Sequence, residues 1–401
     1  MRLLFVADGR SPIARSWIAY LLQAGHQVHL VSTFACDALP GLSSLHSLSV
    51  AFSRSGVSAA PGTAPGGARA MRLRGWVRHW LGPWTVGRAA EQLTARVLEV
   101  QPHVVHAMRI PFEGMLSAGL PSGTPLLISV WGNDFTLHAG ASPGMRRWTR
   151  RCVERADGLH VDCRRDLQLA QTWGFEPARP SLVIPTNGGV QMQLFQPSEA
   201  PQLPVDSDLA RRLAQLGERP VVVQPRGFRV YVRNDAFFQS VPEIVRQVPD
   251  VHFLCPGMAG EAEAERWLQR LGIQAAVSLL PRLAPAEMAG VFQRSRVAVS
   301  PTTHDGTPNT LLEAMATGVF PVAGDLDSLR EWIEPGRNGL LVDPSDPAAL
   351  AQAVVEGLRR DDLRRAAADA NRRLVLERAD YATCMRQAVD LYSRLAASAM
   401  L

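Results

Sequence analysis

Short apolar runs alternate with segments of helical periodicity along the chain. The first run, LLFVA at 3–7, is followed by a polar turn, by the helical pattern IARSWIAYLLQAGH, and by a second run, VHLVST at 28–33. Strand, helix and strand in that order predict a βαβ unit with parallel strands and a right-handed crossover. Further strands are predicted at 104–108, 125–132, 159–163 and 182–185, and helices at 144–156 and 164–173. The first half is therefore predicted to be α/β.

The pattern is interrupted between about 195 and 208, where QPSEAPQLPVDSD is rich in Pro and has no periodicity, which is typical of a linker. Beyond it, helical stretches separate apolar runs at 220–225, 251–257, 277–281, 297–301, 319–324 and 340–343. We predict two doubly wound, Rossmann-like domains whose strand ends face one cleft. The predicted boundaries are 1–198 and 199–378, with a C-terminal helix at 379–401 that packs back toward the first domain.

Composition supports a two-domain globular protein. A chain of 401 residues exceeds the size at which one core stops growing, and 46% apolar with 20% charged residues is ordinary for a soluble protein. No apolar run reaches the length of a membrane-spanning helix, and Asp8 and Gly9 come too early for a signal peptide, so a cytoplasmic location is expected. The five cysteines are scattered, which argues against a disulfide framework or a zinc cage.

All 42 basic residues are Arg, and this excludes reactions that need the amine of a lysine side chain. A pyridoxal Schiff base, a Walker A lysine and a lysine nucleophile are excluded, so any anion site must use guanidinium groups, amides or helix N-termini. The net charge of +5 is modest for this length and does not indicate a nucleic-acid partner.

The segment SPTTHDGTPNTLLEAMATG at 300–318 has the most specific pattern in the chain. Thr307 is predicted to cap a helix that has Pro308 at its first position. The first-turn amides, which belong to Asn309, Thr310 and Leu311, would then lack helical partners and form an anion site suited to a diphosphate.

Two acidic residues, Asp305 and Glu313, flank the predicted helix start. A carboxylate beside bound phosphates is expected to accept hydrogen bonds from sugar or ribose hydroxyls somewhat farther away. The alternative is an ordinary capped helix with Glu313 on a solvated face.

The longer segment SPTTHDGTPNTLLEAMATGVFPVAG, with its acidic pair separated by seven residues, resembles the signature of family-four retaining glycosyltransferases, the group 1 type with the GT-B fold. VIPTNGGVQMQLFQP, EPGRNGLLVDPSDPAALAQAV and the opening strand, glycine-bearing loop and helix are also similar to this family. The resemblance implies an N-terminal acceptor-binding domain and a C-terminal donor-binding domain. It also implies hexosyltransferase-type transfer, with retention and without metal or cofactor, from a nucleotide diphosphate sugar to a hydroxyl of a glycan, a lipid-linked or a small-molecule acceptor.

The resemblance further implies roles for residues of the donor domain. Glu313 would hold the donor ribose, and Asp305 would contact the donor sugar beside the amides of Gly306 and Thr307. Arg226 and Arg233 would grip the diphosphate, with Arg229 as a substitute for either. Asp305 stands where relatives usually have Glu, so the sugar preference is not inherited. Arg282, Gly9 and Arg10 are further candidates for nucleotide-sugar binding.

In the first domain, ISVWGNDF at 128–135 ends a strand where many relatives have a His at the place of Trp131. Asp134 is expected to orient an acceptor hydroxyl. His106 and His138 either reach the cleft or are structural, hydrogen-bonded histidines.

The stretch ARAMRLRGWVRHWLGPW at 68–84 places Trp76 and Trp80 at helical spacing and Arg74 and Arg78 on another face. This pattern fits an interfacial helix at an anionic membrane surface, at the inner face of the membrane. The alternative is a helix that faces the core with Arg at the surface.

Two rival functions remain open at this point. A nucleotide-sugar epimerase of GT-B fold would use the same donor site, and so would a non-catalytic nucleotide-sugar-binding subunit. A GT-B phosphorylase is excluded, because it needs a lysine for pyridoxal.

Overall fold

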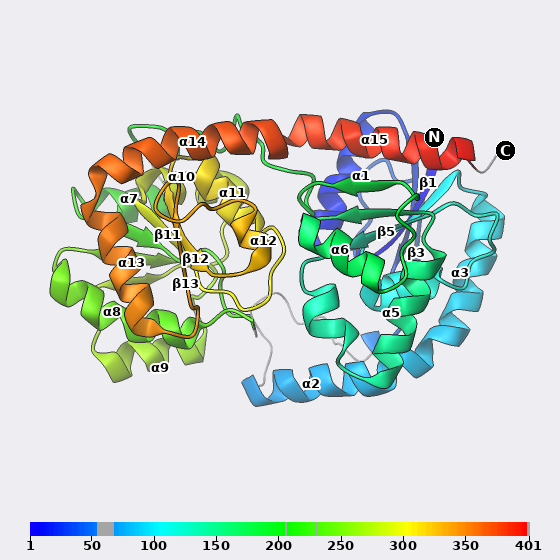
Figure 1. Ribbon diagram of the computed structural model, residues 1–401, viewed down its shortest axis with the longest axis horizontal. Helices are drawn as coiled ribbons and strands as arrows, with labels where there is room; N and C mark the ends of the chain where they lie inside the picture. Colours follow the sequence, from blue (N-terminus) through cyan, green and yellow to red (C-terminus); the bar gives the residue numbers. More distant parts are fainter. Residues whose placement is uncertain (54–67, 205–206, 230, 399–401) are drawn as a thin grey trace. The chain divides into compact units, whose positions relative to one another are not determined.

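The chain folds into two compact units (Figure 1). Unit 1 comprises Met1–Gly189 and Ala382–Leu401, and unit 2 comprises Val190–Tyr381. The computed structural model describes residues 1–53, 68–204, 207–229 and 231–398, and for residues 68–74 the backbone alone. The first change of unit falls a few residues before the predicted boundary at 198/199, and the second a few residues after the one at 378/379.

Unit 1 contains a seven-stranded sheet in which every neighbouring pair is parallel. Its spatial order is β3-β2-β1-β4-β5-β6-β7. The strands are β1 (Arg2–Ala7), β2 (Gln27–Ser32), β3 (Ser44–Ser47), β4 (Val104–Ala107), β5 (Leu126–Val130), β6 (Gly158–Val161) and β7 (Ser181–Val183). The order reverses between β1 and β4, so the topological switch point lies between these two strands.

Helices cover both faces of this sheet. They are α1 (Pro12–Gln23), α2 (Ala68–Leu81), η2 (Gly82–Thr85), α3 (Val86–Val100), η3 (Ile110–Gly114), α4 (Met115–Ser117), η4 (Asp134–Ala139), α5 (Pro143–Arg155), α6 (Arg164–Thr172) and α15 (Tyr381–Ser398). Side chains of α3, α5 and α6 share one core with alternate strand residues. The other face meets α1 and α15, which lie side by side in Figure 1.

The C-terminal helix α15 packs in unit 1 through several buried residues, the largest of which is Tyr392. Its hydroxyl lies 2.7 Å from Nδ1 of His106 in β4, and its ring contacts Phe5 of β1 edge to face. A short turn after α14 therefore returns the chain to the sheet that its first residues began.

Unit 2 repeats the design with a six-stranded parallel sheet in the order β10-β9-β8-β11-β12-β13. The strands are β8 (Val221–Val223), β9 (His252–Cys255), β10 (Val277–Leu279), β11 (Val297–Ser300), β12 (Phe320–Gly324) and β13 (Leu340–Val342). Here the order reverses between β8 and β11. Two parallel, doubly wound α/β units are thus confirmed.

The helices of unit 2 are α7 (Asp208–Ala214), α8 (Asn234–Gln247), α9 (Ala262–Leu271), α10 (Pro285–Arg294), α11 (Asn309–Ala316), α12 (Asp327–Arg330), α13 (Pro347–Arg359) and α14 (Asp361–Ala379). One core joins the sheet to α10 and α11, and the other joins it to α8, α9 and α13 (Figure 1). Successive residues of β8 alternate between the cores: Val221 and Val223 face α11, and Val222 faces α8. The continuous apolar runs are explained by this burial on both faces.

Four of the five cysteines are buried and Cys36 is partly buried, and all five are free thiols. Burial strongly raises the pKa of the Cys152 and Cys163 thiols. Among the described residues, no helix is both long and apolar enough to cross a bilayer.

Candidate active site

The loops that follow β8 and β11 meet at the switch point of unit 2. Three backbone contacts tie them together. Val232 forms an antiparallel bridge with Thr302, the Thr303 amide donates to the Tyr231 carbonyl at 2.9 Å, and the Arg233 amide donates to the Pro301 carbonyl at 2.9 Å. Residues about 70 positions apart in sequence are thereby held in one place, at the edge where doubly wound sheets bind ligands.

Arg226 is the centre of this edge. Its Nη2 lies 2.5 Å from Oδ2 of Asp305, and its Nη1 donates to Oγ1 of Thr310 at 3.3 Å. The side chains of Arg226 and Asp305 are only 7% and 15% exposed, so the pair is shielded from solvent. Three of the residues predicted for donor binding are therefore brought together.

A buried amide pair fixes the backbone beside Arg226. Oε1 of Gln224 accepts the Arg226 amide at 2.8 Å, and Nε2 of Gln224 donates to Asn234 at 2.6 Å. Asn234 in turn donates to the Gly227 carbonyl at 3.2 Å. Gly227 has φ +62°, which favours glycine and turns the chain sharply after Arg226.

Glu313 lies one turn into α11, partly buried, near the guanidinium of Arg226. Burial raises the pKa of its carboxyl to about 7, and Arg226 acts in the opposite direction without cancelling the effect. Glu313 therefore faces the cluster and not a solvated surface.

The start of α11 differs from the prediction at two residues. The helix begins at Asn309 with Pro308, and not Thr307, as its N-cap, and the Thr307 hydroxyl accepts from Nε1 of Trp332 at 3.1 Å. The Leu311 amide donates to the Pro308 carbonyl at 3.0 Å, so it is not an open donor. Within the described chain, the amides left without a protein acceptor in this turn are those of Asn309 and Thr310.

The loop before α11 is also anchored from behind. Ser328 of α12 donates to the Asp305 carbonyl at 2.7 Å, and Gly306 is buried. The side chain of Asp305 consequently projects from a fixed backbone.

Arg233 does not join the cluster. Its guanidinium forms a bidentate pair with Asp235, with both N–O distances 2.8 Å, and also contacts Ser345. The other candidate, Arg229, donates to the Tyr231 hydroxyl at 3.0 Å. Burial acts to lower the pKa of Arg229, but Tyr231 and Asp305 outweigh it, which places Arg229 within electrostatic reach of the cluster. Arg282 is exposed beyond the edge strand β10.

In unit 1, Asp134 is fully buried, and both of its carboxylate oxygens accept hydrogen bonds from the protein, so neither faces an acceptor substrate. Oδ1 accepts from Arg109 at 2.7 Å, and Oδ2 accepts the amides of Ile110 and Trp131, both at 3.1 Å. Its expected contact with an acceptor hydroxyl is therefore corrected: Asp134 holds Arg109, whose guanidinium carbon lies 4.9 Å from the Trp131 ring centroid.

Both candidate histidines make hydrogen bonds with other side chains of the protein, as the structural alternative describes. His106 is buried between the Tyr392 hydroxyl and Ser129, at 2.7 Å from each, and burial lowers its pKa well below the usual range. Nδ1 of His138 lies 3.0 Å from Nε2 of His79.

Gly9 and Arg10 lie in unit 1, after β1. A Cβ on Gly9 would come within 2.4 Å of the Cys36 sulfur and 2.9 Å of the Ser32 hydroxyl, so this close turn requires glycine. Arg10 pairs with Asp8 through two nitrogens and stacks on Phe34 at 3.7 Å.

Sequence reasoning missed a charged cluster beside this loop. Arg109 and Glu113 follow β4, the neighbour of β1. Arg78 of α2 lies close enough to both for electrostatic interaction. The pair of charged residues directly after a buried strand, in RIPFEG, was the available signal.

The tryptophans of α2 and η2 point outward. Trp76, Trp80 and Trp84 are 57%, 45% and 87% exposed, and the guanidinium of Arg78 is turned inward between Phe34 and Phe112. This helix therefore presents aromatic rings, and not Arg78, to solvent, which differs from the alternative of a helix that faces the core with Arg at the surface. Arg69, Arg72 and Arg74 lie outside the described side chains.

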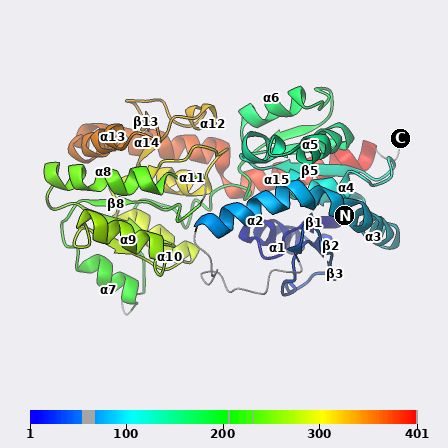
Figure 2. The same ribbon diagram turned by 90° about the horizontal axis from the view of Figure 1, so that it is seen from below.

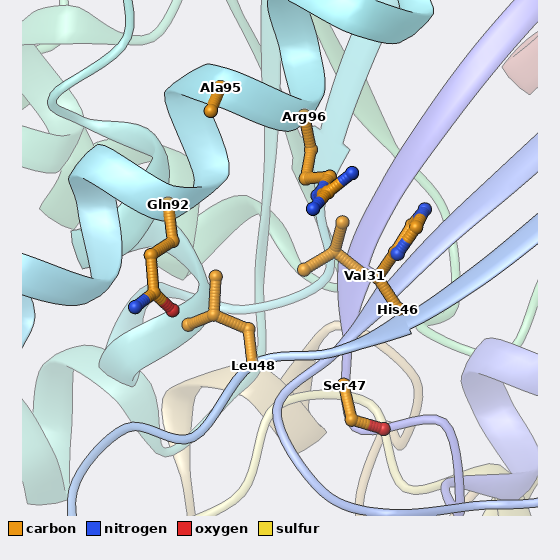
Figure 3. Close-up of a pocket in the computed structure, with 7 residues that line it drawn as sticks. All are labelled: Val31, His46, Ser47, Leu48, Gln92, Ala95 and Arg96. Atoms are coloured by element: carbon orange, nitrogen blue, oxygen red, sulfur yellow. The ribbon is translucent and has the colours of Figure 1, made fainter.

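Two pockets of unit 1 lie away from the predicted site residues. One, of about 240 Å³, separates Gln92 and Arg96 of α3 from Val31 and His46 of the sheet (Figure 3). The other, of about 410 Å³, lies between η2 and α5 and is lined by Trp80, Pro83, Trp84, Ser142, Pro143, Gly144, Arg147, Trp148 and Arg151.

One group among the described residues has metal-ligand spacing. The side-chain ligand atoms of Asp162, Cys163 and Asp166 lie within 4.8 Å of one another, after β6 in unit 1. Arg165 donates to Asp166 at 2.7 Å, and Thr186 donates to Asp162 at 3.0 Å. These side chains therefore already have protein partners that a resident ion would have to displace.

Family models match most of the chain. Residues 9–186 match the glycosyl transferase 4-like domain, and residues 221–360 match the glycosyl transferases group 1 domain. The first region contains every strand of the unit 1 sheet except β1, and the second contains all strands of the unit 2 sheet.

Curated relatives match shorter stretches. A D-inositol 3-phosphate glycosyltransferase of Corynebacterium urealyticum is 32% identical over 139 residues, 33% of each chain. A phosphatidyl-myo-inositol mannosyltransferase of Mycobacterium leprae is 29% identical over 232 residues, 57% of this chain and 58% of the relative. The matches thus span between a third and three fifths of these relatives.

Two of the matching solved structures cover nearly the whole chain. Sucrose-phosphate synthase from Thermosynechococcus elongatus has a TM-score of 0.74 and 18% identity, covering 99% of this chain and 100% of its own. Anabaena HepE, in complex with UDP-glucose, has a TM-score of 0.71 and 15% identity, covering 98% and 100%.

Two parallel α/β units of this topology define the GT-B class of proteins. With both of its units matched by the corresponding family models, the chain belongs to the GT4-type, group 1 glycosyltransferases.

Proposed function

We propose that this chain is a retaining glycosyltransferase that moves a sugar from a nucleotide diphosphate donor to an acceptor hydroxyl. The observation that carries the proposal is the contact of Arg226 with both Asp305 and Thr310, beside Glu313, at the switch point of unit 2. A nucleotide diphosphate sugar is a diphosphate joined to two polyols, the ribose and the sugar. The diphosphate requires cationic and N–H donors, which a guanidinium and the open amides of a helix start supply, and the hydroxyls require acceptors, which two carboxylates supply. The transferase names of the relatives favour this activity over the epimerase.

The leaving diphosphate receives its charge stabilisation from Arg226, Arg229 and the amides of Asn309 and Thr310. Arg226 must release Asp305 to bind phosphate, and the freed carboxylate then accepts hydrogen bonds from the donor sugar. Glu313 accepts bonds from the ribose. Preorganised donors of this kind stabilise charge that develops as the bond to the leaving group breaks.

Retention follows from transfer on a single face of the sugar. The bond between C1 and the phosphate oxygen breaks, the acceptor oxygen bonds to C1 from the same face, and the acceptor proton passes to the departing phosphate oxygen. We propose that no metal is needed, since arginine side chains and amides meet the diphosphate charge. Transfer should then proceed unchanged in excess EDTA.

For the acceptor, we propose a hydroxyl compound of the inositol phosphate or phosphatidylinositol class, the substrates in the relatives' names. We also propose that residues 68–84 contact an anionic membrane surface. The exposed Trp76, Trp80 and Trp84 support this partner, as do Arg147 and Arg151 beside them.

The experiment has two stages. Thermal shifts with a panel of nucleotide sugars identify the donor, and release of the nucleotide diphosphate is then measured with inositol 3-phosphate or phosphatidylinositol vesicles. Proton NMR of the product assigns its anomeric configuration. Arg226→Gln should abolish most turnover, whereas Arg246→Gln, which removes a 71% exposed arginine of α8, is the matched control.

The proposal fails if no nucleotide sugar stabilises the protein, or if Arg226→Gln and Arg246→Gln turn over alike. An inverted product would contradict retention and leave the transferase assignment standing.

A further inference from the structure

The sheet of unit 1 has a switch point of its own, between β1 and β4. Loops from both strands converge there: Asp8 and Arg10 follow β1, and Arg109 and Glu113 follow β4. By the rule that places ligands at such points, this edge is the ligand site of unit 1.

Arginines from three separate elements surround this edge. Arg10 has Asp8 as its partner, and Arg109 has Asp134. Arg78 differs from both, because its guanidinium meets two aromatic faces, 4.6 Å from the Phe112 centroid and 5.6 Å from that of Phe34. Its Nε is buried, and no hydrogen-bond acceptor for it is found among the described residues.

A buried carboxylate stands nearby. Glu113 is 2% exposed and accepts from the Thr33 hydroxyl at 2.8 Å through Oε1, while its Oε2 has no partner in the described chain. Burial raises its pKa, and Arg109 and Arg78 act against that rise. Arg78 and Glu113 thus influence each other electrostatically without a hydrogen bond between them.

The backbone at this point is held in an unusual conformation. Phe112 has φ +72°, in the left-handed region that favours glycine, although it is a large residue with a 2% exposed side chain. Such strain persists where surrounding structure fixes it, and it gathers at ligand sites. Here it directs the Phe112 ring against Arg78.

We propose that Arg78, with Arg10 and Arg109 beside it, binds a phosphate group of the acceptor. A guanidinium flanked by aromatic rings keeps its planar fork available for two phosphate oxygens. A polyol hydroxyl next to that phosphate donates to Oε2 of Glu113. The inference rests on the proposed function only in assigning the phosphate to the acceptor.

The test measures phosphate binding itself. Inorganic phosphate is titrated into the full chain at low ionic strength and followed by phosphorus NMR, in an Arg226→Gln background that removes the donor-unit guanidinium. We expect Arg78→Gln to weaken binding at least tenfold and Arg78→Lys to weaken it less. Arg88→Gln, which changes an exposed arginine of α3, should leave binding unchanged.

A second arm identifies the source of the phosphate and separates this inference from the proposed function. Inositol 3-phosphate should bind more tightly than inositol, and Arg78→Gln should remove the difference; phosphatidylinositol vesicles in place of the soluble ester test a lipid headgroup. If phosphate binding is equal in Arg78→Gln and Arg88→Gln, or absent without either change, the inference is wrong even where donor turnover is intact. Arg78-dependent phosphate binding without sugar transfer would uphold it and defeat the proposed function.

Discussion

At the scale of single residues, Glu313 couples the donor site to the stability of unit 2. Its pKa of about 7 lies above the value of 4.5 for an ordinary glutamate. Below pH 4.5 the carboxyl is protonated in both the folded and the unfolded chain. Between pH 4.5 and 7 the unfolded chain ionises first, so the free energy of unfolding falls as the pH rises.

Glu313→Gln should therefore stabilise the ligand-free protein at high pH. Because the side chain is only partly buried, we expect a gain of about 2 kcal/mol at pH 8 and none at pH 4. Thermal melts of both proteins across this range would measure the gain. A gain that is the same at every pH would show that the ionisation of Glu313 is not its cause.

The three arginines that follow β8 should differ in importance. Arg226→Gln should lower turnover by about 100- to 1,000-fold, because it removes a preorganised charge at the leaving group. Arg229→Gln should have a smaller effect, and Arg233→Gln the least, since Arg233 is engaged by Asp235 and Ser345. Steady-state kinetics on the three variants would give the order. A collapse of activity in Arg233→Gln alone would show that donor binding recruits Arg233.

This order is the reverse of what the family resemblance implies for Arg229 and Arg233. The sequence correctly places both in the loop after the first strand of unit 2. The difference arises from the bond between the Arg233 amide and the Pro301 carbonyl, a contact between distant loops that no local pattern encodes.

At the scale of elements, α2 also shows that local sequence does not encode contacts with distant loops. Its periodicity predicts which residues share a face, but not which face meets the protein. Arg78 turns inward because Phe34 and Phe112, from two other loops, receive its guanidinium, and the tryptophans are left outside. Helices α2 and α5 contact each other (Figure 2).

Arg78 is turned inward, and Arg147 and Arg151 of α5 lie beside Trp80 and Trp84, so we expect these two arginines to contribute to the binding of anionic lipid. Arg147→Gln combined with Arg151→Gln should weaken binding to phosphatidylglycerol vesicles by about 2 kcal/mol at low salt, roughly 30-fold. Trp80→Ser combined with Trp84→Ser should reduce the binding that remains at high salt. Vesicle sedimentation measures both effects.

Leu98→Ser is the matched control for the tryptophans, because Leu98 is 66% exposed on α3. Equal loss with this control, or equal binding to neutral vesicles, would contradict a specific anionic surface at η2 and α5.

At the scale of the whole molecule, the pattern of apolar runs was sufficient for the fold class, but it did not predict the short edge strand β3, which is not continuously apolar. Strands buried on both faces are continuously apolar, so runs such as VVV at 221–223 were recognisable, and parallel topology follows from the helices between them. The acidic pair was found because its residues lie eight positions apart in one segment. The cluster of Arg78, Arg109 and Glu113 was missed because two segments that are distant in the sequence supply it.

Tyr392 should matter to unit 1 and not to unit 2. Tyr392→Ala removes a fully buried ring and should cost about 3–5 kcal/mol. Hydrogen exchange should then show lost protection in β1 and β4, with β8 and β11 unchanged. Tyr392→Phe keeps the ring and should cost less, about 1–3 kcal/mol, by leaving His106 without its partner. Equal loss of protection in both sheets would show that the units unfold together.

The return of α15 to unit 1 also sets the order in which the two units can be completed on the ribosome. Unit 2 is continuous in sequence, so all of it has been synthesised before Tyr392 emerges. Unit 1 begins first but must wait for α15, with the sheet face around Phe5 and His106 uncovered until then. Domains usually fold in the order of synthesis, and here the first to begin is the last to be finished. The proposed acceptor site thus matures only after all of unit 2 has been synthesised.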